Sequence, residues 1–201
     1  MNNHILNKVK VIIIINILGD TMAKIEEMLN KVFDELSVNL KNDTIHCQGK
    51  NGVNTLVLFD EPELIPGEKA RYKIGNLTML VLRDNVPFLS VEVIPTAPTP
   101  PKTIAGLFPV HMVTRSIVIN RQGSNNLKYD LDELENKLLL LIVVPDQSET
   151  VKEAQFVDLD EKFRGVINLR SEYSNVKDFA IAPLRKMIPV LNDLLKKNSM
   201  E

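Results

Sequence analysis

Residues 77–94 read LTMLVLRDNVPFLSVEVI, and this stretch decides the fold. Two apolar, β-prone runs, Leu77–Arg83 and Phe88–Ile94, are separated by only four residues, Asp84-Asn85-Val86-Pro87. A short break of this kind predicts an antiparallel pair of strands. Alternation in the second run predicts one wholly apolar face and one face that carries a carboxylate: Leu89, Val91 and Val93 on the first, and Phe88, Ser90, Glu92 and Ile94 on the second.

The segment before this pair predicts a helix and further strands. From Met22 to about Lys41, apolar residues recur at steps of three and four, which is typical of an amphipathic helix. A short segment, Thr44–Cys47, and a strand, Asn54–Phe59, follow on either side of a glycine-containing turn and are expected to form a hairpin. Residues Asp60–Gly67 contain two prolines and are expected to form a loop.

The segment after the pair is expected to return to the sheet. Prolines between residues 95 and 101 predict an extended exit, with a helix or turn starting at Lys102 and broken by Gly106 and Pro109. A short strand is expected at Ser116–Asn120, and the unbroken apolar run Leu138–Val144 indicates a strand buried on both faces.

Two further helices are expected in the second half of the chain. Asp130, with Glu133 three residues later, resembles the capping arrangement at a helix start. The apolar residues between Val176 and Leu195 predict a final helix, kinked or split by Pro183 and Pro189. The expected order of helices and strands belongs to the α/β class.

Composition limits the classes of protein that need to be considered. The 201 residues, 44% of them hydrophobic and 25% charged, predict one folded α/β domain over residues 22–201, with residues 1–21 as an extension or poorly ordered terminus. The apolar run within residues 11–18 is too short to span a bilayer, so no membrane contact is expected. A single cysteine favours a cytoplasmic location. The net charge of -2 gives the whole chain no attraction for nucleic acid.

Few residues form a recognisable chemical motif. The sequence contains no glycine-rich phosphate loop, no G-x-S-x-G and no paired-cysteine metal motif. His46 and Cys47 are adjacent, but neighbours in a strand point to opposite faces, and the other histidines, His4 and His111, lie in unrelated settings. Glu92 is the most informative residue, because a carboxylate inside a core strand is costly unless a partner or a cation stabilises it.

The layout around Glu92 resembles the PD-(D/E)XK nuclease superfamily, which has the restriction-endonuclease-like fold. An amino-terminal helix precedes three strands, and the third carries Glu92 and leads through PTPPKTIAGLFP into a helix. The resemblance implies a central mixed sheet, built from a three-strand meander plus later strands and flanked by helices. In that family, acidic residues on the second and third core strands hold Mg2+ and a lysine assists phosphodiester hydrolysis.

When the family pattern is carried over residue by residue, two of its positions have no matching residue in this chain. Glu92 matches the glutamate of the third strand, and Glu26, Glu27 or Glu35 would be the accessory helix acid. No acid stands near Asn76-Leu77-Thr78, where the aspartate should fall, and Ile94 stands in place of the lysine. Asp60 and Asp84 are candidate substitutes among the metal ligands, and Lys102 is a candidate substitute for the catalytic lysine. The resemblance therefore favours a degenerate site.

These residues lead to one hypothesis and two alternatives. The first is a catalytically degenerate restriction-endonuclease-like domain, associated with nucleic acid or regulatory, whose phosphate contacts come from Lys102, Arg115, Arg121 and Lys128. The second is an active Mg2+-dependent endonuclease that cuts DNA through Glu92, Asp60 or Asp84, and Lys102. The third is a non-enzymatic protein-interaction or structural domain, which includes a homo-oligomer. Whether the chain is an enzyme stays open at this point.

Overall fold

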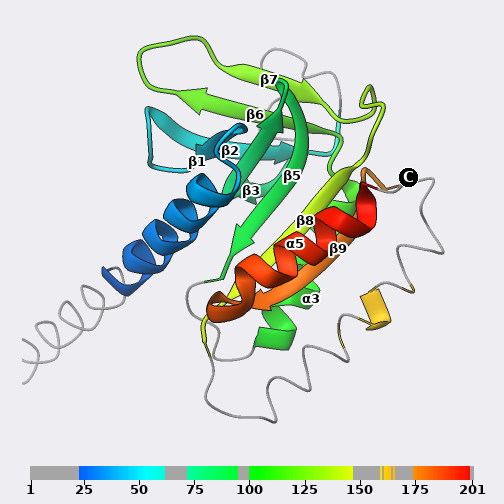
Figure 1. Ribbon diagram of the computed structural model, residues 1–201. Coiled ribbons are helices and arrows are strands. Elements are labelled where there is room, and N and C mark those ends of the chain that lie inside the picture. Colours follow the sequence, from blue (N-terminus) through cyan, green and yellow to red (C-terminus); the bar gives the residue numbers. More distant parts are fainter. Residues whose placement is uncertain are drawn as a thin grey trace, which may run out of the picture.

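The computed structural model describes residues 23–61, 72–94, 100–146, 159, 161–163, 165 and 174–199 (Figure 1). The expected extension at residues 1–21, most of the loop expected at Asp60–Gly67 and the proline-rich exit at residues 95–99 lie outside these ranges. The side chains of residues 100–103 also lie outside them. Over the described residues, the chain is an α/β protein with a central mixed sheet flanked by helices, as the sequence predicts. A second sheet, which the sequence analysis does not predict, takes up four of the strands.

A mixed sheet of five strands forms the centre of the molecule. Its strand order is β1-β4-β5-β8-β9. The first three strands are antiparallel neighbours, whereas β5 pairs parallel with β8 and β8 pairs parallel with β9. The bounds are Thr44–Cys47 for β1, Met79–Arg83 for β4, Val86–Val93 for β5, Leu138–Val144 for β8 and Val176–Pro183 for β9.

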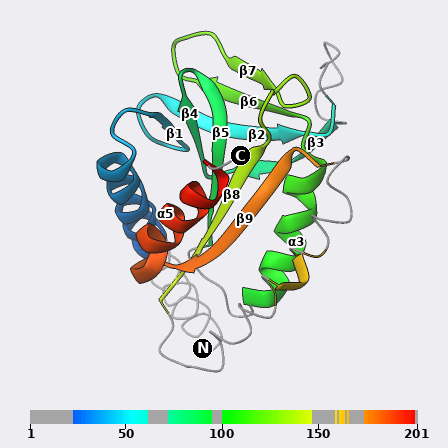
Figure 2. The ribbon, with the colours of Figure 1, turned by 45° about the vertical axis from the view of Figure 1, so that its right-hand side comes forward.

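A second, antiparallel sheet of four strands lies across one end of the central sheet (Figure 2). Its order is β3-β2-β6-β7, with bounds Lys73–Leu77, Val53–Phe59, Ser116–Arg121 and Leu127–Asp130 respectively. The two sheets share a hydrophobic cluster that joins Leu56 and Ile117 of the smaller sheet to Leu80 and Leu138 of the larger one. Burial of these side chains holds the sheets together.

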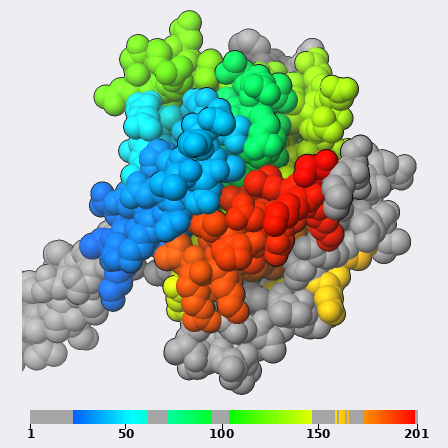
Figure 3. Space-filling model, in the orientation of Figure 1, coloured from blue at the N-terminus to red at the C-terminus, as the bar shows by residue number. Residues whose placement is uncertain are grey.

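Helices cover both faces of the central sheet. The amino-terminal helix, residues 23–39, and α5, Met187–Asn198, pack on one face and bury Val32, Leu36 and Leu191 against it (Figure 3). On the other face, α3, Pro100–Val113, packs through Ile104 and Phe108. The predicted alternation in β5 is confirmed for Leu89, Val91 and Val93, which all face the first pair of helices. Phe88, predicted on the opposite face, packs against the same cluster, because the pairing register with β4 shifts between Val81 and Leu82.

The prediction for β8 is also confirmed. Each residue from Leu138 to Val144 is buried, and the strand lies between β5 and β9 in the interior of the sheet. An unbroken apolar run is expected where helices or another sheet cover both faces of a strand.

The predicted strand Leu77–Arg83 is wrong in one respect, because it is two strands. Leu77 ends β3 and pairs with Leu56, Thr78 forms a bend, and Met79 begins β4 and pairs with Cys47 and Val91. The chain passes from one sheet to the other at Thr78. The predicted β1–β2 hairpin is wrong for a related reason. The turn that contains Gly49 and Gly52, both at positive φ, sends β2 into the second sheet.

The helix predictions need four corrections. α3 begins at Pro100 rather than Lys102, and it continues through Gly106 and Pro109 because packing of its apolar face on the sheet outweighs local propensity. No helix starts at Asp130. Its carboxylate accepts a hydrogen bond from the Asp132 N–H at 3.0 Å, which stabilises a turn.

The carboxy-terminal helix is shorter than predicted. Residues Val176–Pro183 form strand β9, because their apolar side chains fit the edge of the sheet beside β8. A 3-10 turn at Leu184–Lys186 leads into α5. Pro189 lies in the first turn of α5, where a helix does not need its N–H, so it does not kink the helix. Among the described residues, no helix combines the length and apolar character that crossing a membrane requires.

Candidate functional site around Glu92

Glu92 lies near the carboxyl end of β5, on the face that α3 covers. Its side chain is 13% exposed. The backbone N–H of Thr78 donates a hydrogen bond to Glu92 Oε2 at 3.2 Å, and the Thr78 hydroxyl accepts one from the Val93 N–H at 3.2 Å. The bend between β3 and β4 is therefore bonded to the end of β5 through both a carboxyl and a hydroxyl group.

His111 of α3 completes the surroundings of this carboxyl. Its side chain is 3% exposed, and its Nε2 lies 3.9 Å from Glu92 Oε2. Nε2 is buried and has no hydrogen-bond partner among the residues that the structure describes. β3 also packs tightly on α3, since a Cβ added to Gly75 would lie 3.0 Å from Val110 Cγ1. Glu92 is thus enclosed by β5, α3 and the β3–β4 bend.

Burial sets the charge of both groups. It raises the pKa of Glu92 to about 7, although the hydrogen bonds from Thr78 act in the opposite direction. Burial also lowers the pKa of His111 to about 4. Between these values the pair consists of an uncharged carboxylic acid and an uncharged imidazole, which is the form that a largely apolar environment favours.

The candidate metal ligands do not gather around Glu92. Asp84 lies in the turn before β5, and from Val86 to Glu92 a strand rises roughly 20 Å at about 3.3 Å per residue. Asp84 and Asn85 both have positive φ, which accounts for these residue types in a two-residue hairpin turn. Asp60 follows β2 in the smaller sheet, and its Oδ1 is buried without a hydrogen-bond partner in the described part of the chain.

The remaining candidates do not complete a metal site within the described residues. Lys102 lies in the first turn of α3, and its side chain is not among those that the structure describes. The exposed acids Glu26, Glu27 and Glu35 lie on the amino-terminal helix, which packs on the opposite face of the sheet from Glu92. The described part of the chain contains no group of three or more His, Cys, Asp or Glu side chains able to hold a metal ion.

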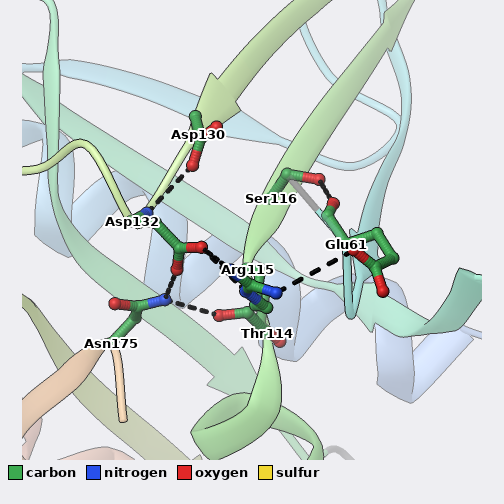
Figure 4. Close-up of polar contacts among 7 residues, drawn as sticks. All are labelled: Glu61, Thr114, Arg115, Ser116, Asp130, Asp132 and Asn175. Carbon is green, nitrogen blue, oxygen red and sulfur yellow. Dashed lines mark hydrogen bonds and ion pairs between the residues drawn. The ribbon is translucent and has the colours of Figure 1, made fainter. Parts of the chain in front are cut away.

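Arg115, a predicted phosphate contact, is engaged by carboxylates instead (Figure 4). Its Nε donates to Asp132 Oδ2 at 2.7 Å, and Glu61 lies 3.9 Å from the guanidinium. Asn175 donates to the other oxygen of Asp132 at 2.8 Å and to the Thr114 carbonyl at 3.1 Å. This network joins the start of β6 to the segments after β7 and before β9, beside a pocket of about 640 Å³ that Asp60 also lines.

Arg121 and Lys128 differ from Arg115, because neither forms an ion pair with another described residue. Arg121 ends β6 beside an exposed loop, residues 122–126. Burial and the charge of Arg121 both lower the pKa of His46, so the guanidinium lies near the imidazole of β1. Lys128 instead lines a pocket of about 650 Å³ that includes the acids Asp84, Asp130, Glu133 and Glu135. Arg121 is therefore the better candidate for a phosphate contact.

Cys47 is not arranged as a nucleophile. The thiol packs in the core beneath the amino-terminal helix, and burial raises its pKa to about 11. Its neighbour His46 is only partly buried.

His111 is the residue that sequence reasoning missed. The signal was present, because His111 stands seven residues after Ile104 and three after Phe108, on the same helical face. The predicted break at Gly106 and Pro109 concealed that periodicity.

Comparison with protein-family models, with curated proteins and with solved structures finds no match to this chain. The resemblance to the PD-(D/E)XK superfamily therefore stays a prediction, and functional inference depends on the site itself.

Proposed function

We propose that this chain is a restriction-endonuclease-like domain that has lost its metal site and acts by binding nucleic acid. The observation that carries the proposal is the state of Glu92, which is enclosed and uncharged over much of the range below pH 7. Among the described residues, Glu92 belongs to no group of three or more His, Cys, Asp or Glu side chains that could hold a metal ion.

The environment of Glu92 does not suit Mg2+. This ion prefers charged oxygen ligands in octahedral geometry and keeps several of its waters. One oxygen of Glu92 already accepts the Thr78 N–H, and the nearest titratable partner is the buried imidazole of His111. An imidazole is a poor ligand for this ion. A carboxyl group in this position stabilises the junction of three elements instead of collecting a cation.

Arg121 supports the second half of the proposal. Arg121 has no carboxylate partner among the described residues and lies next to an exposed loop, so its guanidinium is available to a phosphate group. Binding of this kind is electrostatic, insensitive to sequence and strongly dependent on salt. Arg115 is assigned no role in binding, because Asp132 and Glu61 already neutralise it.

The test measures binding and cleavage with the same full-length protein. Fluorescence anisotropy with single- and double-stranded oligonucleotides, at rising salt, should detect binding that Arg121→Gln weakens, with a salt slope smaller by about one. Lys31→Gln is the matched control, since it removes one positive charge from the amino-terminal helix on the far face of the central sheet. It should leave affinity nearly unchanged.

Cleavage is assayed with Mg2+ and with Mn2+. No cut product should form with either ion. Metal-dependent cleavage that Glu92→Gln abolishes would overturn the proposal in favour of an active endonuclease. Absence of binding even at low salt would overturn it in favour of a protein-interaction or structural domain.

A further inference from the structure

We propose that the rim between the two sheets, formed by His46, Arg121 and Tyr129, binds single-stranded nucleic acid: Arg121 holds a phosphate, and the ring of Tyr129 stacks on a neighbouring base. This inference rests on the proposed function and narrows its ligand. A base is free to stack on a side chain where the strand is unpaired, whereas in a duplex it is already stacked on its neighbours.

Strand pairing places Arg121 and Tyr129 on the same face of the smaller sheet. Tyr129 of β7 pairs with Ile117, and Arg121 of β6 pairs with Val53. Side chains of residues paired in this way point to the same face of a sheet. Ile117 and Val53 both belong to the hydrophobic cluster between the sheets, so Arg121 and Tyr129 lie on the inner face of the smaller sheet. Arg121 is exposed and Tyr129 is partly exposed, which puts both at the rim of that cluster.

His46 faces these two residues from the central sheet. It pairs with Leu80, another member of the same cluster, and is partly exposed. Burial and the charge of Arg121 both lower the pKa of His46. Burial raises the pKa of the Tyr129 hydroxyl, and the charge of Arg121 acts in the opposite direction. Because water and salt screen charges that lie farther apart than about 10 Å, the guanidinium lies near both rings.

The surroundings of Tyr129 favour a base over a phosphate. Tyr129 also borders the pocket of about 650 Å³ that Lys128 lines. Four carboxylate residues line this pocket with only two basic residues, Arg83 and Lys128, and Asp43 already pairs with Arg83. The excess of negative charge repels a phosphate but not an uncharged base. The phosphate is therefore assigned to Arg121 and the base to Tyr129.

The two contacts differ in the nucleic acids that they recognise. A phosphate contact at Arg121 is open to single strands and duplexes alike. Stacking on an aromatic side chain requires an unpaired base, and it contributes about fivefold to 150-fold in affinity for each base. The rim should therefore bind a single strand more tightly than a duplex of the same sequence, by at least about fivefold.

Fluorescence anisotropy with an oligonucleotide and with its duplex, at one low salt concentration, tests the proposal. Tyr129→Leu should weaken binding of the single strand by at least about fivefold and leave binding of the duplex unchanged. Tyr129→Phe keeps the ring and is the matched control, so it should bind the single strand as the wild type does. Arg121→Gln should weaken binding of both ligands.

The outcomes distinguish this inference from the proposed function. Equal affinity of the wild type for the two ligands, or unchanged single-strand affinity in Tyr129→Leu, would overturn the stacking role and leave nucleic-acid binding in place. A wild-type protein that binds neither ligand would overturn both.

Photochemical cross-linking of the wild-type chain keeps the test decisive if Tyr129→Leu does not fold. The single strand carries iodouracil in place of thymine. Under ultraviolet light, an iodouracil stacked on an aromatic side chain forms a carbon–carbon bond to the ring, and the iodine and one ring hydrogen leave as HI. Mass spectrometry of the digested product should locate this bond at Tyr129. A bond at an aromatic residue outside the rim would overturn the proposal.

Discussion

The backbone N–H of Thr78 is bonded to the carboxyl of Glu92 at 3.2 Å, and this one contact joins the point where the chain changes sheets to the strand that carries its buried acid. The Thr78 hydroxyl adds a second bond to Val93. The bend and the end of β5 therefore form one structural unit, which α3 covers through His111.

The first prediction concerns global stability between about pH 4.5 and 6.5. In this window the unfolded chain has an ionised Glu92 and a protonated His111, whereas the folded chain has a protonated Glu92 and a neutral His111. Each state binds one proton at the pair. The contributions of the two groups cancel, so the pair adds almost no pH dependence to the free energy of unfolding.

Single substitutions should reveal the pH dependence that each of the two groups contributes to the free energy of unfolding. In Glu92→Gln only the lowered pKa of His111 remains, so stability should rise with pH by up to about 1.4 kcal/mol per unit relative to the wild type. In His111→Gln only the raised pKa of Glu92 remains, so stability should fall with pH by a similar amount. Urea denaturation at pH 4.5, 5.5 and 6.5 measures the free energy of unfolding of both variants. A change with pH of the same sign in the two variants would contradict the assigned protonation states.

The second prediction concerns the Thr78 hydroxyl. Thr78→Val keeps the side-chain shape but removes the acceptor of the Val93 N–H, and an unsatisfied amide at this site should cost about 1–3 kcal/mol of unfolding free energy. Thr78→Ser retains the acceptor and serves as the control. Chemical denaturation compares the variants, and equal stability of Thr78→Val and Thr78→Ser would show that the hydroxyl bond does not matter.

The third prediction distinguishes the roles of Arg115 and Arg121 in stability and in binding. Arg115→Gln removes a partly exposed ion pair, and a double-mutant cycle with Asp132→Asn should give a coupling of about 0.5–1 kcal/mol in stability. Its affinity for oligonucleotides should match the wild type. Arg121→Gln should show the reverse pattern, with lower affinity and unchanged stability. Loss of affinity in Arg115→Gln would show that Arg115 contacts the oligonucleotide after all.

The fourth prediction concerns Cys47. With 1% of the residue exposed and a pKa of about 11, the thiol should not react with an aromatic disulfide reagent at pH 8 in the folded protein. It should react fully after unfolding in guanidinium. Rapid reaction of the native protein would mean that β1 and the amino-terminal helix separate readily.

Local patterns predicted the strands that have a strong period or an unbroken apolar run. The alternation in β5 and the seven buried residues of β8 are examples. Patterns failed where tertiary pairing decides the outcome. Val176–Pro183 has apolar spacing compatible with a helix, but the open edge of β8 makes it a strand. Thr78 carries no local signal of a change of sheet, since its role depends on partners 14 and 15 residues away.

The candidate site was predicted in part. The unusual position of Glu92 is visible in the sequence, because a single acid interrupts an apolar strand. Its partner His111 lies on a distant helix and becomes visible only when α3 is known to be continuous. The partners of Arg115 could not be foreseen for the same reason, since Asp132 and Asn175 come from separate segments that meet only in the folded chain.

The position of β8 in the sheet has a consequence during synthesis on the ribosome. Its seven residues, LLLLIVV, carry no charge and no proline, which is the composition of an aggregation-prone segment. One edge of β8 pairs with β5, which is translated earlier, but the other waits for β9, which begins at Val176. A nascent chain that has not yet reached that point exposes an unpaired apolar edge, so we expect co-translational chaperones to bind there.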